Sequence, residues 1–363
     1  MKKEADSKRM MVAAQKAEHG GDDMARRLFA AVLLLCLLTG CSIPAGSKPT
    51  IYETSYFTVF DTVITVKGTA QSRESFEATA EQIYDGLEHY HRLFDIYHDY
   101  EGINNIKTIN DRAGRSPVVV DPEIIALLKD CIYYYDLTRG RTNVVMGSVL
   151  QLWHEARSTA ITHPETAALP DRAELEEAAQ HTDIACLVID EVASTVYLSD
   201  PDACLDVGAV AKGWTVQRIT AQIPSGFLLN AGGNVCATGP KTEGEPWIIG
   251  IQDPRGNSGE YLHTLCVDAV SVVTSGDYQR GYSVDGEQYH HIIDPDTRMP
   301  SEYWRSVTVV SEDSGLADAL STAFFVMPLE EGMLLAESLD VEVLWVDAAG
   351  EEYMTSGFEN YFS

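Results

Sequence analysis

The sequence is poor in positive charge. It carries 26 Lys and Arg residues against 55 Asp and Glu residues, which gives a formal net charge of −29. Nucleic-acid binding needs basic patches that neutralise phosphates, and none occurs after Arg27, so a nucleic-acid partner is excluded. An acidic surface also repels a free nucleotide. A nucleotide site in this chain would therefore need helix N-termini, backbone N–H groups or a divalent metal.

The cysteines lack the spacing of a metal site or of a disulfide framework. Seven are present, and no two of them form a CxxC pair. Five lie beyond the N-terminal region, scattered and mostly within apolar stretches, as is typical of buried free thiols: Cys131, Cys186, Cys204, Cys236 and Cys266. The sequence also has no internal repeat and no low-complexity run.

The apolar run near the N-terminus is too short for a transmembrane helix. It covers Leu28 to Leu38, follows Met24-Ala-Arg-Arg and leads into Thr39-Gly40-Cys41. Positive charge, an apolar core and small residues in this order are typical of a secretory signal. Residues 1–41 are therefore predicted to be an N-terminal extension and signal peptide whose true start is Met24, and residues 42–50 a tether.

The end of this signal resembles the lipobox of bacterial lipoproteins. Leu-Thr-Gly-Cys would make Cys41 the lipidated first residue of the mature chain. This resemblance implies a lipid-anchored protein on the extracytoplasmic face of the bacterial cytoplasmic membrane. An ordinary cleaved signal with an incidental cysteine is the alternative.

Residues 51–363 are predicted to form a single α+β domain. Apolar spacing predicts helices over 74–97, 122–139, 142–157, 171–180, 209–223 and 315–327. Strands are predicted over 56–66, 187–190, 195–199, 204–207, 227–230, 235–238, 247–252, 262–267, 269–273, 304–311 and 341–346, and a polar loop over 104–115. This order favours mixed or antiparallel sheets with flanking helices over a doubly wound parallel sheet.

The stretch 271–300 combines small hydroxyl residues, a hairpin and histidines. The first strand is expected to break at Thr274-Ser275-Gly276, where small residues let backbone N–H groups approach an anion. Asp285-Gly286 is a strong hairpin signal. His291, followed three residues later by Asp294, is a base that titrates near neutral pH with a carboxylate to orient it. A surface hairpin with an ordinary histidine pair fits the same residues.

Two glycine-containing turns could approach a ligand closely. The segment 206–213 (DVGAVAKG) runs from a strand into a helix, which leaves free N–H groups at the turn, with Asp206 before it and Lys212 about one turn into the helix. A tight strand–helix junction with a surface lysine is the alternative. Gly232-Gly233 fits either a hairpin turn or a place where a flat ring lies against bare backbone.

Asp318 and Thr322 lie four residues apart on a predicted helix, so both oxygens share one face. A carboxylate and a hydroxyl are hard oxygen ligands of the kind that suits Mg²⁺. The alternative is that the helix dipole favours Asp318 as an early-turn charge and that Thr322 bonds back to a carbonyl.

With these segments in this order, the chain resembles the ApbE family of FAD:protein FMN transferases. The motifs are DVGAVAKG at 206–213, LLNAGGN at 228–234, TSGDYQRGY at 274–282, HHIIDPDTRMP at 290–300 and DALSTAFFVM at 318–327. The resemblance extends more faintly through 60–62, 94–97 and 138–147. It implies an α+β fold related to the tunnelling fold.

The resemblance implies Mg²⁺-dependent cleavage of the substrate FAD, transfer of FMN to a threonine hydroxyl of an acceptor protein, and release of AMP. The acceptor is expected to be a membrane redox subunit or a secreted flavoprotein. Asp318, Thr322 and a backbone oxygen of Ala209 match the metal ligands, and His291 matches the base, with Asp294 beside it. Contacts to the flavin nucleotide are implied for Phe60, Tyr97, Asn143, Asp206, Lys212, Gly232, Gly233, Thr274, Ser275, Gly276 and Ile292.

Two departures from the family pattern stand out. Arg298 replaces a glycine of many members, and Arg141-Thr142-Asn143 replaces a small-aromatic-Asp triplet, which leaves Asn143 as the flavin contact expected there. Two other functions fit the same motifs. An FAD pyrophosphatase would use water in place of the acceptor, and a flavin-binding lipoprotein would have no turnover.

Overall fold

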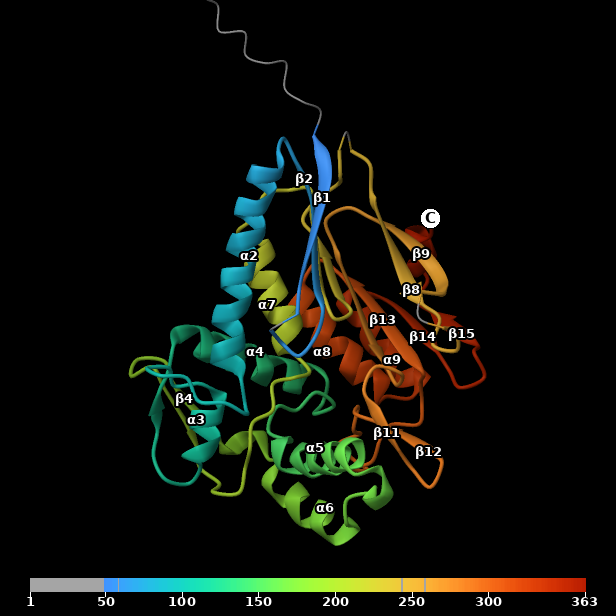
Figure 1. The fold of residues 1–363 in the computed structure, drawn as a ribbon. Helices are drawn as coiled ribbons and strands as arrows, with labels where there is room; N and C mark the ends of the chain where they lie inside the picture. The colour runs from blue at the N-terminus through green and yellow to red at the C-terminus, as the bar shows by residue number, and fades with distance from the viewer. Residues whose placement is uncertain (1–48, 58, 243, 258) are drawn as a thin grey trace, which may run out of the picture. The chain divides into compact units, whose positions relative to one another are not determined.

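An eight-stranded antiparallel sheet organises the computed structural model, which describes residues 49–363 except 58, 243 and 258 (Figure 1). The predicted signal peptide, Cys41 and nearly all of the tether lie outside the described residues. The strands follow the order β1 (Thr50–Tyr56), β2 (Ile64–Ala70), β6 (Phe227–Ala231), β7 (Asn234–Ala237), β10 (Ser271–Gly276), β13 (Ser306–Ser311), β14 (Glu342–Val346) and β15 (Glu352–Met354).

Side chains alternate between the two faces of this sheet, as β-geometry requires. In β10, Val273 packs into a cluster with helix α8 (Ser314–Phe325), whereas Val272 packs on the opposite side against the hairpin of β8 (Trp247–Gln252) and β9 (Tyr261–Val267). Helix α7 (Ala211–Thr220) packs against α8 on one side and against α2 (Arg73–Phe94) on the other, and α9 (Leu329–Leu339) contacts β14. The central strands are therefore covered on both faces.

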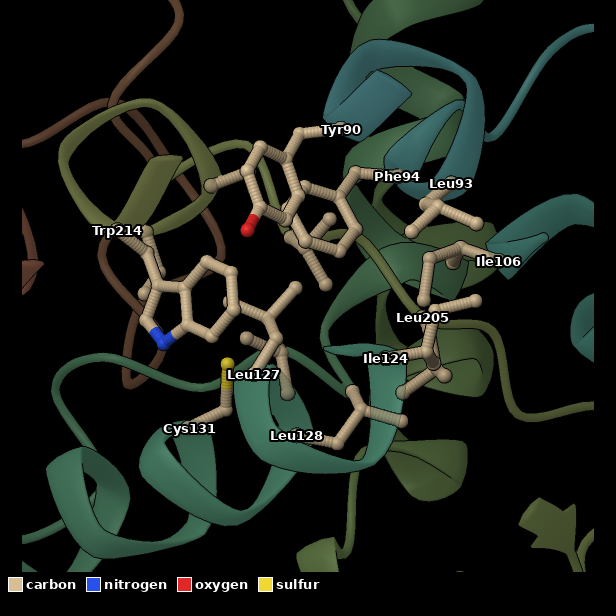
Figure 2. Close-up of a cluster of buried hydrophobic side chains, with 14 of the residues drawn as sticks. Tyr90, Leu93, Phe94, Ile106, Ile124, Leu127, Leu128, Cys131, Leu205 and Trp214 are labelled. Atoms are coloured by element: carbon tan, nitrogen blue, oxygen red, sulfur yellow. The ribbon is translucent and has the colours of Figure 1, made fainter. Parts of the chain in front are cut away.

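An aromatic cluster joins α2 and α7 to helix α4 (Pro122–Leu137) (Figure 2). Trp214 of α7 meets the rings of Tyr90 and Phe94 of α2, each with a centroid separation of 5.6 Å and a near-perpendicular orientation. Leu127 and Cys131 of α4 lie next to it. Edge-to-face aromatic pairs of this kind add about 0.5–1.5 kcal/mol beyond their buried area. The cluster holds α7, which carries the glycine-containing turn at its start.

The remaining elements form two smaller groups and a set of short 3-10 helices. Helix α5 (Gly147–Thr162) packs on α6 (Arg172–Ala178) and on the hairpin of β11 (Gly281–Val284) and β12 (Glu287–His290) (Figure 1). A small sheet has the order β3 (Val118–Val119), β5 (Thr195–Leu198), β4 (Leu187–Asp190), with α3 (Ile106–Asp111) against β5. The short 3-10 helices are η1 (Pro164–Thr166), η2 (Ala179–His181), η3 (Ile184–Cys186) and η4 (Phe358–Tyr361).

Residues 49–363 form one compact unit. Within the described part of the chain, no helix has the length and apolar character needed to cross a bilayer.

The α+β class and most elements are as predicted. The hairpin turn at Asp285-Gly286 is confirmed, with φ values of 52° and 92° that fit a type I′ turn. The predicted strand 56–66 is wrong. The segment instead contains the end of β1, a reversal of the chain and the start of β2, which pairs with β1. The reversal passes through Phe60 and Asp61, whose φ values of 55° and 49° are left-handed. Alternation alone does not reveal such a reversal.

Three other predicted boundaries are wrong for local reasons. The polar loop 104–115 contains α3, because Asn105 and Thr108 form a capping box that starts a helix. Helix α5 begins at Gly147 rather than 142, since Asn143 Oδ1 accepts the Val145 N–H and holds a turn before it. The segment 204–207 is no strand but a single parallel bridge between Cys204 and Met146. Helix α9 was not predicted.

Candidate active site

Helices α7 and α8 meet at a glycine. The Gly213 N–H donates a 2.8 Å hydrogen bond to Oδ2 of Asp318, whose residue is only 4% exposed. A Cβ at position 213 would lie 2.3 Å from the Ser314 carbonyl oxygen and 2.4 Å from the Asp318 Cβ. Any other residue at 213 would therefore push the two helices apart and separate the carboxylate from this N–H.

The cost of burying the Asp318 carboxylate is only partly offset by its neighbours. Burial raises its pKa, while Lys212 and hydrogen bonds from the Gly213 backbone and the Asn234 side chain lower it. Lys212 Nζ lies 3.9 Å from Oδ2, at the limit of an ion pair. Asn234 Oδ1 is buried and has no hydrogen-bond partner in the described chain. Two oxygens at one buried place, one charged and one unpaired, favour a cation.

The turn before α7 leaves another oxygen unpaired. In a regular helix the Gly213 N–H would bond to the Ala209 carbonyl, but it is used by Asp318. No backbone N–H of a described residue bonds to the Ala209 carbonyl. Asp206 shapes this turn, because its Oδ1 accepts the Gly208 N–H at 2.8 Å and its own N–H donates to Val144.

The paired glycines form the β6–β7 hairpin turn. Gly232 and Gly233 have φ values of 60° and 96°, which glycine adopts without strain. A Cβ on Gly232 would lie 2.3 Å from Thr62 Oγ1, so the backbone approaches the β1–β2 loop closely. The Thr274 N–H donates to the Gly233 carbonyl at 3.1 Å. Segments distant in the sequence thus meet at this turn.

The hydroxyls of β10 are tied to neighbouring elements. Thr274 to Gly276 continue the strand in register with β13, so the predicted break is wrong. The Ser275 hydroxyl lies 2.8 Å from the Ser321 hydroxyl, which donates to the Asp318 carbonyl at 2.9 Å. These bonds fix α8 on the sheet one residue before Thr322, whose own hydroxyl makes no hydrogen bond to a described residue.

His291 is held as a neutral imidazole. Its Nδ1 lies 3.2 Å from the Arg280 carbonyl oxygen, which can only accept, so the proton is on Nδ1 and the lone pair on Nε2. Burial, followed by the charges of Arg280, His290 and Lys212, lowers the pKa of His291 to about 3, so the expectation that it titrates near neutral pH is wrong for the free protein. Arg280 also donates to the Asp61 carbonyl at 3.2 Å. Arg280 and Lys212 thus place two cations near one neutral base.

Asp294 does not orient His291 in this structure, contrary to the sequence prediction. Its Oδ1 accepts the Asp296 N–H at 2.8 Å and lies 3.7 Å from Arg141 Nη1. The Asp294 carboxylate thus caps the turn that follows it and makes no hydrogen bond to His291. The Arg280 carbonyl takes the orienting position instead.

Four residues predicted to contact the flavin differ in what their side chains can do. Tyr97 is 55% exposed, and Phe60 is partly buried with its ring 5.6 Å from that of His91. The Asn143 amide is occupied by the Thr182 carbonyl and the Val145 N–H. Ile292 is a core residue, and its N–H and carbonyl are both hydrogen-bonded. Asn143 and Ile292 therefore have structural roles that explain their presence.

Arg298 has a left-handed backbone, with φ of 61°. We expect Arg298→Gly to raise the free energy of unfolding by about 0.5–1 kcal/mol, because relief of the left-handed strain exceeds the added chain entropy of glycine. Urea unfolding measures the change. Arg172→Gly, in the first turn of α6, is the control and should destabilise by about 1 kcal/mol. An equal loss for both variants would contradict the prediction.

Three residues near the site were not predicted from the sequence. Arg280 and Asn234 lie inside the motifs at 274–282 and 228–234, so their position within those motifs could have identified them as site residues. His154 had no signal of this kind. It lies 3.1 Å from the Tyr97 hydroxyl through Nδ1 and 3.9 Å from Asp206 Oδ2 through Nε2.

Known proteins are similar to this chain in sequence and in fold. The model of the ApbE family matches residues 60–345. An FAD:protein FMN transferase of Treponema pallidum is 34% identical over 260 residues, which is 66% of this chain and 70% of the relative. One of Vibrio cholerae is 28% identical over 352 residues, covering 93% and 99%. The crystal structure of an ApbE protein from Thermotoga maritima has a TM-score of 0.77 and 30% identity, covering 86% of this chain and 100% of that one.

A second solved structure agrees. The flavin transferase ApbE from Vibrio cholerae has a TM-score of 0.71 and 25% identity over 86% of this chain and 99% of its own. The matched region contains α7, β10 and α8 and almost all of the residues described above. The α+β fold and the resemblance predicted from the motifs are confirmed, and the chain belongs to the ApbE family.

Proposed function

We propose that this protein transfers the FMN part of FAD to a threonine hydroxyl of an acceptor protein and releases AMP. The observation that carries the proposal is the buried Asp318 carboxylate at the α7–α8 contact, with Lys212 beside it and the neutral His291 close to Lys212. The relatives from Treponema pallidum and Vibrio cholerae named as FAD:protein FMN transferases support it. Binding of a flavin alone would require neither a base nor a buried carboxylate.

The oxygen atoms of the site fit a magnesium ion. Asp318, Thr322 and the Ala209 carbonyl would hold it, with the unpaired Asn234 Oδ1 nearby. When bound, Mg²⁺ neutralises pyrophosphate charge and polarises the phosphoryl group. Asp318 supports this fit, because a carboxylate whose pKa is raised by burial gains from a cation.

The chain's own cations would bind the anionic part of FAD. Lys212 and Arg280 both act on His291 electrostatically, so both lie near the reacting centre. Phosphate oxygens between them would be attracted by two positive charges on a chain whose formal net charge is −29. These two residues therefore bind and orient the pyrophosphate.

His291 would move the proton. Its Nε2 lone pair accepts the proton of the threonine hydroxyl while the threonine oxygen bonds to the phosphorus of the FMN part. The bond between that phosphorus and the bridging oxygen breaks, and its electron pair leaves with AMP. With a pKa of about 3, His291 is a weak base in the free protein. Phosphates that offset Lys212 and Arg280 raise this pKa toward a useful value.

We also propose that the acceptor is reached on the extracytoplasmic side of the membrane. Support comes from the signal-like and lipobox-like residues up to Cys41, which lie outside the described part of the chain. An acceptor there would be a membrane redox subunit or a secreted flavoprotein. Localisation of the full-length chain in membrane fractions, and its loss in Cys41→Ala, tests the anchor.

Incubation with FAD, Mg²⁺ and an acceptor protein tests the function. We expect a covalent flavin band on the acceptor and one AMP per flavin transferred, and no band on an acceptor whose target threonine is replaced by valine. Free FMN and AMP without a band would mean hydrolysis by water. Bound FAD that stays intact after addition of Mg²⁺ would mean binding without turnover.

A further inference from the structure

His154 lies between two residues of the proposed flavin site. Its Nδ1 is 3.1 Å from the Tyr97 hydroxyl, and its Nε2 is 3.9 Å from Asp206 Oδ2. Tyr97 follows α2 and Asp206 precedes α7, so the imidazole connects two segments that are more than a hundred residues apart in sequence. The chemistry proposed above does not use this histidine.

Helix α5 holds the histidine in a fixed place. At its start, the Gly147 N–H donates to the Cys204 carbonyl at 3.0 Å, and a Cβ on Gly147 would lie 2.4 Å from that oxygen. Next to His154, Trp153 Nε1 donates to the Arg298 carbonyl at 3.0 Å. The helix is therefore tied both to the segment that carries Asp206 and to the loop that follows His291.

The direction of the hydrogen bond between Tyr97 and His154 follows from the tyrosine. Although Tyr97 is 55% exposed, desolvation on its covered side, and then the carboxylates of Asp206 and Asp61, raise its pKa to about 12, against the lowering effect of Arg280 and Arg157. The hydroxyl thus keeps its proton and can donate to Nδ1, which places the other proton of a neutral imidazole on Nε2, toward Asp206. The histidine can fix the phenol and face the carboxylate at the same time.

We propose that His154 is a positioning residue that fixes Tyr97 and Asp206 for binding of the flavin nucleotide. The inference rests on the proposed function, because it takes those two residues as flavin contacts. Tyr97 is 55% exposed and has little else to hold its ring. Without His154 the ring must be ordered when the ligand binds, which weakens binding by about 3- to 10-fold. A fixed ring mainly improves affinity and leaves the chemical step unchanged.

A double-mutant cycle on FAD affinity tests the proposal. The full chain is titrated with FAD, and the dissociation constant is read from flavin fluorescence for His154→Ala, Tyr97→Phe and the double variant. We expect each single variant to weaken binding about 3- to 10-fold and the double variant to be no weaker than the worse single one, because both remove the same contact. At saturating FAD, kcat of His154→Ala should stay within about twofold of wild type, with KM raised.

Two further variants separate positioning from a general packing role. His154→Asn keeps an acceptor in place of Nδ1 and should recover most of the affinity. His163→Ala, at the exposed C-terminal end of the same helix, should leave affinity unchanged. Additive losses in the cycle, or unchanged affinity in His154→Ala, would overturn the proposal. If wild type binds FAD without transferring it and the cycle stays non-additive, the transferase function fails while the positioning role stands.

Discussion

Replacing Asp318 by alanine is expected to reduce metal-dependent AMP formation from FAD by on the order of 10³-fold while the protein stays folded. The carboxylate is the one charged oxygen among the proposed metal ligands, so its loss removes most of their attraction for a divalent cation. Steady-state AMP release with and without Mg²⁺, together with circular dichroism, measures both parts. Near-normal AMP release would contradict the assignment of Asp318 as a metal ligand.

Asp313→Ala is the matched control on the same helix. Its side chain caps α8 by accepting the N–H groups of Gly315 and Leu316. Loss of this cap should cost about 1 kcal/mol of stability but leave metal-dependent turnover close to wild type. A large drop in turnover for both variants would mean that α8 as a whole, rather than the Asp318 carboxylate, is required.

The isosteric Asp318→Asn variant separates charge from shape. Asparagine keeps an acceptor for the Gly213 N–H but has no charge to bury. Burial raises the pKa of Asp318 in the folded protein above its value in the unfolded chain. Ionisation of Asp318 therefore does not lower the free energy of unfolding of the wild type below about pH 4, and lowers it increasingly as pH rises toward the folded-state pKa. In the absence of metal, the Tm of Asp318→Asn relative to wild type should therefore increase with pH over this range and then level off.

Replacing His291 by alanine is expected to lower transfer to the acceptor by about 10²- to 10⁴-fold with FAD still bound. The threonine hydroxyl loses its proton acceptor, whereas Lys212 and Arg280 remain to bind the phosphates. Single-turnover formation of covalent flavin and equilibrium FAD binding measure the two effects. Undiminished transfer between pH 6 and 8 would reject His291 as the base.

The pH dependence follows from the depressed pKa of His291. In the free protein it is about 3, so kcat/KM should show no histidine limb between pH 6 and 8. Bound phosphates raise this pKa, so the acid limb of kcat should lie at higher pH than that of kcat/KM. His290→Ala is the control: its Nε2 bonds to the Ser301 carbonyl and its ring packs on Phe325, so stability should fall and transfer should persist.

The sequence allowed the family and the motif positions to be predicted, because each motif combines residue types that are recognisable over a few positions. Gly213, for example, stands one residue after Lys212 in a strand-to-helix pattern. What it contacts could not be predicted, since the Asp318 carboxylate is 105 residues away. The function of that glycine is visible only once α7 and α8 are packed together.

Short-range spacing was misleading for His291. A carboxylate three residues later suggested an orienting partner, but Asp294 closes the turn that begins with it and faces Arg141. The partner is a backbone oxygen of Arg280, which no side-chain pattern encodes. Likewise, Asn143 matched a site position, and its amide proves to be committed to Thr182 and Val145. Backbone acceptors and amide bonds across loops are set by tertiary structure.

The contact at Gly213 also bears on which ion the proposed metal site would accept. Backbone and side-chain atoms of α7 and α8 already touch there, so the helices cannot move closer and can only separate. Mg²⁺ binds oxygen at about 2.0–2.1 Å and Ca²⁺ at about 2.3–2.6 Å. A larger ion would have to loosen the helix contact, so the discrimination between the two is connected to packing inside the protein. Residues that touch no ligand could therefore tune the ion preference of the enzyme.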